Sequence, residues 1–271
     1  MEGLKLFHYS GLSYLFAFIA GASIGSFLNV VIHRWPREES LVNPGSHCPS
    51  CSRPIPWYWN LPVISWLALR GKCRFCGARI PVRYLLVELA GGLWAVLCLW
   101  RFGPSVPALA GFAFGAALLA GSAIDLVHRL LPDTTTLGLV PLGLVMALLP
   151  ESWTQGWEVN WYESLLGMAG GSALFLFVLL AFEVLTGKEG MGMGDVKLMA
   201  GVGACLGYMS LPLIIMFAGL AGIAAWLLLF LAGKAGREFQ MPFGPFISAA
   251  AVAVLLLWPL LEKHMLIYHF I

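Results

Sequence analysis

Long apolar stretches recur along the whole chain and constrain its fold more than any other feature of the sequence. A transmembrane helix needs about 20 mostly apolar residues, and eight stretches come near this length. Of the 271 residues, 59% are hydrophobic and only 11% are charged, which is typical of membrane proteins. Segment 197–209 is the shortest and is rich in glycine. The predicted spans are 12–32, 84–100, 106–127, 135–149, 164–185, 197–209, 211–231 and 246–261.

Lysine and arginine residues indicate the orientation, because the loops on the cytosolic side of a membrane protein are enriched in them. The segment between the first two predicted spans is rich in arginine, whereas the loop between the fourth and fifth spans contains Glu151, Glu158 and Glu163 and no basic residue. We therefore expect the N-terminus outside and the long first loop in the cytosol. The basic residues after the third, fifth and seventh spans agree with this orientation: Arg129, Lys188, Lys234 and Arg237.

The first apolar stretch has a second interpretation, a cleaved signal peptide, since Ala20-Gly21-Ala22 is similar to a small-residue cleavage site. The apolar run continues to Ile32, and Lys5 is the only basic residue before it, which favours an uncleaved span. The formal net charge of +2 is dispersed along the chain, so nothing indicates nucleic acid as a partner. Membrane lipid is the expected environment.

Two C-x-x-C pairs stand out in the one segment that is not continuously apolar, residues 33–82. Cys48 and Cys51 are separated from Cys73 and Cys76 by twenty-one residues, close to the spacing of a Cys₄ zinc site. Four thiolates leave no open coordination position, so the expected role of the zinc is structural. A segment of this size has a marginal hydrophobic core, and a metal would help it to fold.

Disulfides are the alternative for these cysteines, but they require an oxidising compartment, and the basic residues place the loop in the reducing cytosol. A redox C-x-x-C site is not expected to occur as a doubled pair. Cys98 and Cys205 lie in apolar spans and are predicted to be buried as small hydrophobic side chains.

Carboxylates inside predicted spans are the main candidates for chemistry, because charge is costly in a bilayer. Asp125 and Asp195 are expected near the cytosolic ends of the third and sixth spans. Two carboxylates at one depth can share a proton and activate water, as in aspartic peptidases. Glu183 is assigned no role, and Asp133, which follows Pro132, is predicted to cap the fourth helix.

Asp195 follows three alternating glycines, Gly190, Gly192 and Gly194. Such a stretch is a poor helix former, so we expect open backbone beside the carboxylate, where an extended substrate segment can approach. The simpler alternative is that Asp195 only caps the sixth helix. If both carboxylates are used, the position of Asp195 at a helix start favours its charged form and makes Asp125 the expected proton carrier.

Over nearly its whole length the chain resembles the bifunctional type IV prepilin peptidases, which are leader peptidases and N-methyltransferases. The matching pieces are specific, and His33 is the one small departure, at a position where an aromatic residue is expected. These pieces are the segments 25–34, 83–88, 192–197 and 242–245, the two C-x-x-C pairs, and Asp125 with Leu131-Pro132-Asp133.

The resemblance implies a multi-pass enzyme of the bacterial inner membrane that cleaves the leader from prepilins and from pseudopilins of type II secretion. It implies Asp125 and Asp195 as the catalytic pair, and methylation of the new N-terminal residue with S-adenosylmethionine. It also implies Glu88 as a residue of the cofactor site, against an alternative in which Glu88 only pairs with Arg83. The cysteine loop favours the methyltransferase activity, because relatives restricted to peptidase activity tend to lack it.

The predicted architecture is an all-α polytopic membrane protein of about eight transmembrane helices, with a small cytosolic Cys₄ zinc module between the first and second. The predicted divisions are a first helix (1–32), a zinc-binding module associated with methyl transfer (33–82) and a membrane-embedded aspartic peptidase core (83–271). Three alternatives stay open: a peptidase whose zinc loop is purely structural, a membrane carrier or channel with carboxylates along its path, and a non-enzymatic scaffold.

Overall fold

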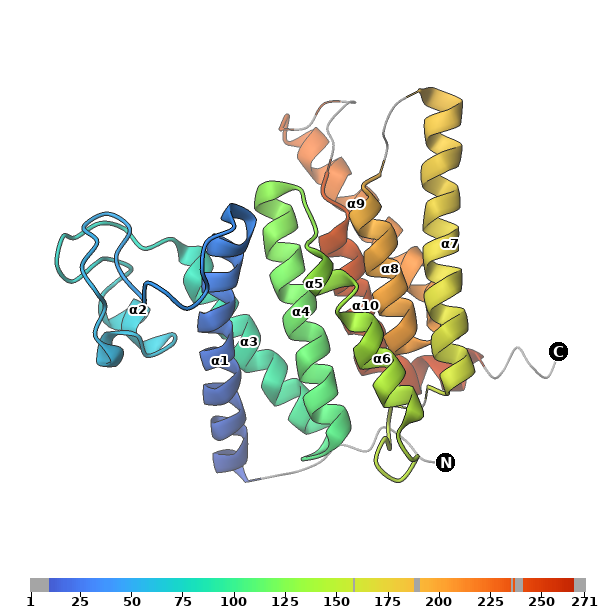
Figure 1. Cartoon of the computed structure of the whole chain (residues 1–271), viewed down its shortest axis with the longest axis horizontal. Helices are drawn as coiled ribbons and strands as arrows, with labels where there is room; N and C mark the ends of the chain where they lie inside the picture. Colours follow the sequence, from blue (N-terminus) through green and yellow to red (C-terminus); the bar gives the residue numbers. More distant parts are fainter. Residues whose placement is uncertain (1–9, 158, 188–190, 235, 237–240, 266–271) are drawn as a thin grey trace. The chain divides into compact units, whose positions relative to one another are not determined.

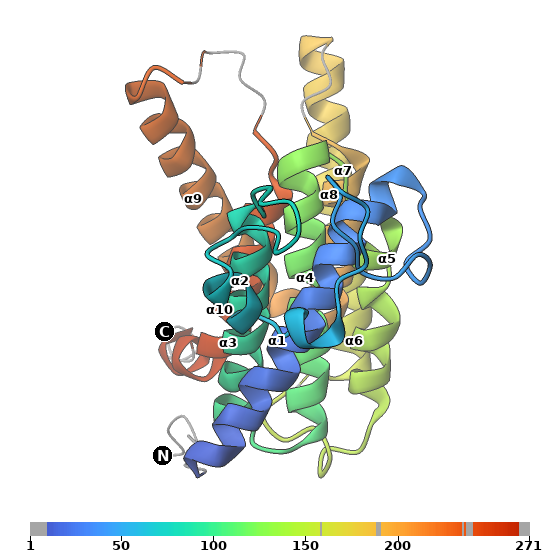
Figure 2. The same cartoon turned by 90° about the vertical axis from the view of Figure 1, so that its left-hand side faces the viewer.

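The computed structural model describes residues 10–157, 159–187, 191–234, 236 and 241–265. Within these residues the chain is helical, and its only extended pairings are two isolated β-bridges. The chain divides into two compact units, which are treated separately below (Figures 1 and 2). The N-terminal unit is Leu6–Pro104, and the C-terminal unit holds Ser105–Ile271.

The N-terminal unit is built on two long helices, α1 (Gly11–Arg34) and α3 (Val82–Phe102), which pack side by side (Figure 1). Glycines allow this close approach: a Cβ atom at Gly21 would lie 2.4 Å from the carbonyl oxygen of Gly91. Packing of this kind, backbone against backbone, is common between membrane helices.

The segment between α1 and α3 contains only short helices: η1 (Trp35–Arg37), η2 (Trp57–Trp59) and α2 (Ile64–Ala68). The buried guanidinium of Arg34 anchors its first part, donating to the carbonyl oxygens of Ser40 at 2.9 Å and Pro44 at 2.7 Å. This segment is therefore held by specific polar contacts and not by a large apolar core.

The C-terminal unit is organised around α8, in which eleven of the fourteen residues are buried. Helix α7 packs along α8 through facing glycines, since a Cβ at Gly167 would lie 2.1 Å from the carbonyl oxygen of Gly203. The helices α5, α6 and α10 also contact α8. The elements of this unit are α4 (Val106–His128), α5 (Asp133–Thr136), α6 (Leu139–Leu148), α7 (Trp161–Thr186), α8 (Met193–Leu206), η3 (Tyr208–Ser210), α9 (Leu211–Leu231) and α10 (Gly244–Met265).

Five helical segments within the described residues are long and apolar enough to cross a membrane, so the predicted count of eight is not confirmed. The predicted span 135–149 is divided into α5 and the ten-residue α6, and 197–209 corresponds to the fourteen-residue α8. At about 1.5 Å per residue, α6 and α8 are shorter than the bilayer core of about 30 Å. The apolar character of α8 reflects burial inside the protein. The five segments are Gly11–Arg37, Val82–Phe102, Val106–His128, Trp161–Thr186 and Tyr208–Leu231.

Some residues used in the sequence predictions fall outside the described part of the chain: Lys5, Glu158, Lys188, Gly190 and Arg237. The orientation predicted from the basic residues stays a prediction.

Candidate functional site

The four loop cysteines lie on two knuckles with the same backbone pattern. In the first knuckle the N–H of Cys48 donates to the carbonyl oxygen of Arg53 at 3.0 Å, and the N–H of Ser52 donates back to Cys48 at 2.8 Å. In the second, the N–H of Cys73 donates to Ala78 at 2.8 Å, and Gly77 donates back to Cys73 at 2.9 Å. Both turns reach positive φ at the same position, with 54° at Ser52 and 72° at Gly77. Each turn brings its two thiols to one side.

The two knuckles bring all four sulfur atoms together, within 4.8 Å of one another. The Sγ atoms of Cys48 and Cys76 are 3.8 Å apart. A tetrahedral ion with Zn–S bonds of about 2.3 Å requires sulfur atoms about 3.8 Å apart, so the donor set fits zinc. The thiols are free, and the alternative of two disulfides is not the arrangement found.

The backbone around Cys73 favours the thiolate that a metal requires. Hydrogen bonds from the backbone at Cys76, and then from Phe75, lower the pKa of the Cys73 thiol to about 7. Cys98 and Cys205 are not part of this cluster and are buried at 1% and 0% exposure, which confirms their prediction as core residues.

Glu88 lies in the same unit, on α3, and is buried at 8% exposure. Its Oε2 atom accepts the backbone N–H of Val63 at 2.7 Å, and the Ser26 side chain bonds to the same carboxyl group. The alternative, a surface ion pair of Glu88 with Arg83, is not the arrangement found. Glu88 is part of the wall of a cavity of about 240 Å³, together with His33, Arg34 and residues of both cysteine knuckles.

Asp125 lies near the end of α4 in the C-terminal unit and is buried at 6% exposure. Its Oδ2 atom accepts the backbone N–H of Gly244, at the start of α10, at 3.2 Å. A Cβ at position 244 would lie 2.7 Å from this oxygen atom. Only glycine therefore lets the α10 backbone reach the carboxylate at this distance.

Asp195 lies in the first turn of α8 and is buried at 7% exposure. The N-cap of the helix is Gly192, so the alternative in which Asp195 is only the cap is wrong. Gly192 is extended, with φ −80° and ψ 146°, as expected for an open backbone, whereas Gly194 is already helical. A Cβ at Gly194 would lie 2.9 Å from the Cβ of Leu131, so this glycine makes room for the α4–α5 connection.

Leu131 links the surroundings of the two aspartates. Its side chain would meet a Cβ at Gly194, the second residue of α8, and also a Cβ at Gly244, whose N–H reaches Asp125. The two carboxylates lie near enough for their charges to interact. Within the described residues, neither forms an ion pair. The structure thus brings two buried carboxylates, one from α4 and one from α8, to a shared site.

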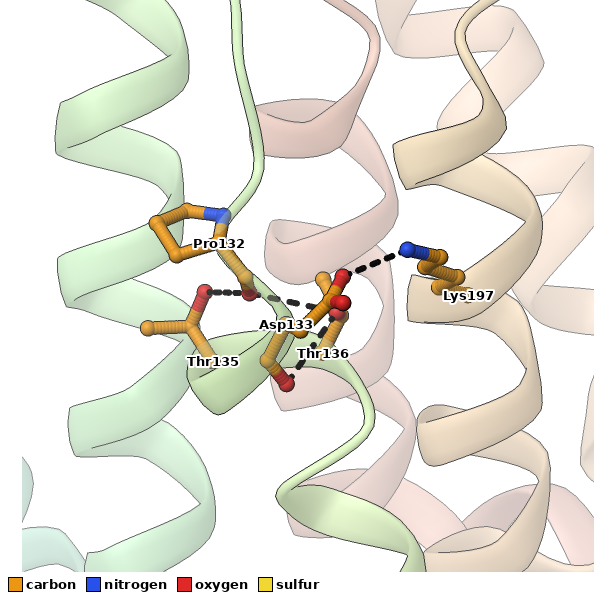
Figure 3. A network of polar contacts seen from close by, with 5 residues as sticks. All are labelled: Pro132, Asp133, Thr135, Thr136 and Lys197. Atoms are coloured by element: carbon orange, nitrogen blue, oxygen red, sulfur yellow. Dashed lines mark hydrogen bonds and ion pairs between the residues drawn. The ribbon is translucent and has the colours of Figure 1, made fainter. Parts of the chain in front are cut away.

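Asp133 is not a helix cap, contrary to the prediction. It is the first residue of α5, and its Oδ1 atom accepts a hydrogen bond from the Nζ atom of Lys197 at 2.6 Å (Figure 3). The buried hydroxyl of Thr135 donates to the carbonyl oxygen of Pro132 at 2.9 Å, and no side chain accepts an N–H group at the start of α5. The ion pair links α5 to α8 only two residues after Asp195.

Two family models match the chain in succession. The bacterial peptidase A24 N-terminal domain matches residues 19–102, and the type IV leader peptidase family matches residues 112–227. A Burkholderia pseudomallei prepilin leader peptidase/N-methyltransferase is 39% identical over 271 residues, covering 91% of this chain and 86% of that protein. The chain belongs to the type IV leader peptidase family.

Further relatives carry the same name. The Stutzerimonas stutzeri protein is 40% identical, with 90% of each chain covered, and the Aeromonas hydrophila protein is 38% identical, with 94% of each covered. No solved structure matches the chain. The predicted enzyme class, an aspartic endopeptidase with N-methyltransferase activity, is confirmed by these similarities.

Sequence reasoning missed several contacts around the aspartates of this leader peptidase family member. The segment 242–245 was matched to the family without a role, and the structure gives Gly244 a hydrogen bond to Asp125. Lys197 was likewise part of a motif without a role. The available sequence signals were a glycine between Phe243 and Pro245 and a lysine two residues after Asp195, but neither signal specifies its partner in the fold.

Proposed function

We propose that this chain cleaves the leader from type IV prepilins with Asp125 and Asp195 and then methylates the new N-terminal residue with S-adenosylmethionine. The observation that carries the peptidase half is the burial of both carboxylates at one site, without a cationic partner among the described residues. Both lie within residues 112–227, which match the type IV leader peptidase family. Pseudopilins of type II secretion belong to the same substrate class.

In this mechanism the two carboxylates share one proton. The ionised carboxylate takes a proton from the attacking water, while the protonated one donates a hydrogen bond to the scissile carbonyl. The amide nitrogen then leaves as a protonated amine after the carboxylates exchange roles. The extended backbone at Gly192 offers an edge beside Asp195 on which a substrate segment can lie.

The position of the proton follows from two opposing contacts. The N-terminal turn of α8 favours a charged Asp195, as predicted from the sequence. The N–H of Gly244 favours a charged Asp125, which counts against the prediction that Asp125 is the proton carrier. The carboxylates therefore titrate as a pair, and the proton belongs to both.

For methyl transfer we assign the methyl-donor site to the cavity beside Glu88. S-adenosylmethionine, when bound, supplies an electrophilic methyl group. The buried carboxylate of Glu88 and the rings of Trp59, Trp66 and Phe75 in the cavity wall are suited to hold a cationic ligand with a flat base. The chain's further task is to position an α-amine, which has a pKa of about 7.7 to 8.0 and needs no strong base.

The Cys₄ knuckles hold zinc in a structural role in this proposal. Cys48 and Cys73 both lie in the cavity wall, so the metal shapes the methyl-donor site without touching the substrate. The roles follow the predicted division: segment 33–82 serves methyl transfer, and 83–271, with Glu88 near its start, contains the peptidase core. The expected location is the bacterial inner membrane, with the zinc loop in the cytosol.

The decisive experiment incubates the purified full-length protein in detergent with a prepilin and labelled S-adenosylmethionine, and identifies both products by mass. The proposal expects a shortened pilin that carries one additional methyl group. Glu88→Gln is expected to lower methylation while cleavage continues, and Glu38→Gln, an exposed glutamate of the same loop, is the matched control. Intact prepilin after incubation with zinc-loaded protein contradicts the peptidase half. Cleavage without methylation leaves the peptidase-only alternative.

A further inference from the structure

The loop between α1 and α3 contains a short segment with several large exposed apolar side chains, called the strip below. The strip consists of Trp57, Tyr58, Ile64 and Leu67, on η2 and α2. Trp57 is 79% exposed and Ile64 is 63% exposed. Large exposed apolar side chains gathered in so short a segment are unusual in water and indicate a contact with a partner or with lipid.

The inner side of the same segment is part of the N-terminal unit. Ser65 is buried, and the indole N–H of Trp66 donates to the carbonyl oxygen of Ile80 at 3.4 Å. Gly71 sits against this indole ring, since a Cβ at that position would lie 2.7 Å from it. The strip is therefore the outward side of a packed segment, and its side chains have a defined direction.

The depth of the strip follows from the bond between Val63 and Glu88. Helix α3 has 21 residues and rises about 30 Å, the thickness of the hydrocarbon core, so its first residue, Val82, lies near one edge of that core. Glu88 is six residues further along, about 9 Å inside this edge. The N–H of Val63 donates to Glu88 at 2.7 Å, which brings the middle of the strip to the same level. In Figures 1 and 2, α2 lies level with the length of α1 and not beyond its end.

The charges around the strip agree with this depth. Residues 54–69 contain no lysine, arginine, aspartate or glutamate. Exposed arginines, Arg53 and Arg70, lie directly on both sides. Segments that lie at a membrane interface typically contain tryptophan and tyrosine and are flanked by arginines, which reach anionic headgroups.

We propose that segment 57–67 is inserted into the lipid interface beside α1 and α3, with the strip facing acyl chains. One face of this segment contacts lipid, while Trp59, Ser65 and Trp66 line the cavity from the other face. The loop between the two spanning helices is then a membrane-embedded wall and not a freely exposed soluble module. This inference rests on the geometry of the N-terminal unit alone and does not depend on the proposed methyl transfer.

Photolabelling tests this inference directly. The full-length zinc-loaded protein is placed in nanodiscs of phosphatidylethanolamine and phosphatidylglycerol that contain a phospholipid with a diazirine in its acyl chain. After irradiation, adducts are mapped by peptide mass spectrometry. We expect adducts on 57–67 at a level comparable to those on Leu86, an exposed residue of α3, and few on the cysteine knuckles. Labelling of α1 and α3 with an unlabelled strip overturns the proposal.

A double variant sharpens the test. Ile64→Asp with Leu67→Asp is expected to lower lipid adducts on residues 57–63 at least about tenfold, because carboxylates are costly in the hydrocarbon region. Val42→Asp changes an even more exposed apolar residue outside the strip, and its adducts on 57–63 should stay at the wild-type level. Zinc content is measured in both variants to show that the loop is folded. Unchanged adducts in a folded double variant contradict the proposal, as does a chain dimer in the nanodisc that covers the strip.

Discussion

The two units bring their polar site residues together in different ways. In the N-terminal unit, four thiols lie together on two knuckles. Each knuckle is held by backbone hydrogen bonds between residues close in sequence, so most of the geometry of the cluster is local. In the C-terminal unit, Asp125 and Asp195 are seventy residues apart in sequence and lie on different helices, and glycines at 194 and 244 make room for the chain to pack around them. The first site is fixed by short-range turns, and the second exists only after several helices have packed. Changes at each site should therefore have separable consequences.

Substitution of the aspartates is expected to separate cleavage from methylation by the largest factor. Asp125→Asn and Asp195→Asn should each lower the turnover of prepilin cleavage by about 10³-fold, because general acid and base catalysis contributes about 10²- to 10⁴-fold. Methylation of a synthetic mature N-terminus should continue, since Glu88 and the cysteines lie in the other unit. Cleavage is measured by gel shift, with Glu183→Gln, an exposed carboxylate on α7, as the control. One of the two variants retaining near-normal turnover would remove the shared-proton pair from the mechanism.

The reverse separation is expected from the cysteines. Cys48→Ser or Cys73→Ser should reduce zinc affinity by at least about 100-fold, since even changes to the outer shell of a metal site cost 10- to 100-fold. Metal content, measured by mass spectrometry of the purified protein, should fall together with methylation, and prepilin cleavage should remain. Cys98→Ala, which removes a buried thiol outside the cluster, should keep the zinc. Full methylation by a zinc-free variant would show that zinc in the knuckles is not needed to shape the methyl-donor cavity.

A smaller effect is expected where α10 meets Asp125. Gly244→Ala places a Cβ within 2.7 Å of Asp125 Oδ2, so the N–H of residue 244 must withdraw from the carboxylate. A hydrogen bond to a charged group is worth about 1.5 to 3 kcal/mol, and we expect cleavage to fall by about tenfold or more. The pH profile of cleavage should shift as well, because this bond favours the charged form of the pair. Gly219→Ala, on α9 with open space around it, is the control. A wild-type pH profile in Gly244→Ala would mean that the contact is only structural.

The same contrast explains what the sequence could predict. The Cys₄ cluster was predictable because each C-x-x-C turn forms from residues within six positions, and only one spacing between the knuckles had to be judged. The long helices α1, α3, α4, α7 and α9 were predictable from apolar length. The environment of α8 was not predictable, and the segment was taken for a membrane span. Hydropathy does not distinguish a helix surrounded by protein from one surrounded by lipid. The two aspartates were found as costly charges, but the Gly244 bond depends on the arrival of α10, which no local pattern specifies.

The pairing of Asp133 with Lys197 was missed for a related reason: an aspartate after a proline is also a good helix cap, and only the packing of α5 on α8 decides between the two roles.

The smallest effect on cleavage is expected from the ion pair of Asp133 with Lys197. Asp133 and Lys197 are 62% and 36% exposed, and exposed ion pairs contribute about 1 kcal/mol or less. Asp133→Asn and Lys197→Met should each lower cleavage by about fivefold or less, and the double variant should be no worse than either single variant. The decrease should also shrink at high salt, where the wild-type pair is screened. A loss as large as that of Asp195→Asn, unaffected by salt, would show that Lys197 acts on the reacting groups themselves and is not only a tether between α5 and α8.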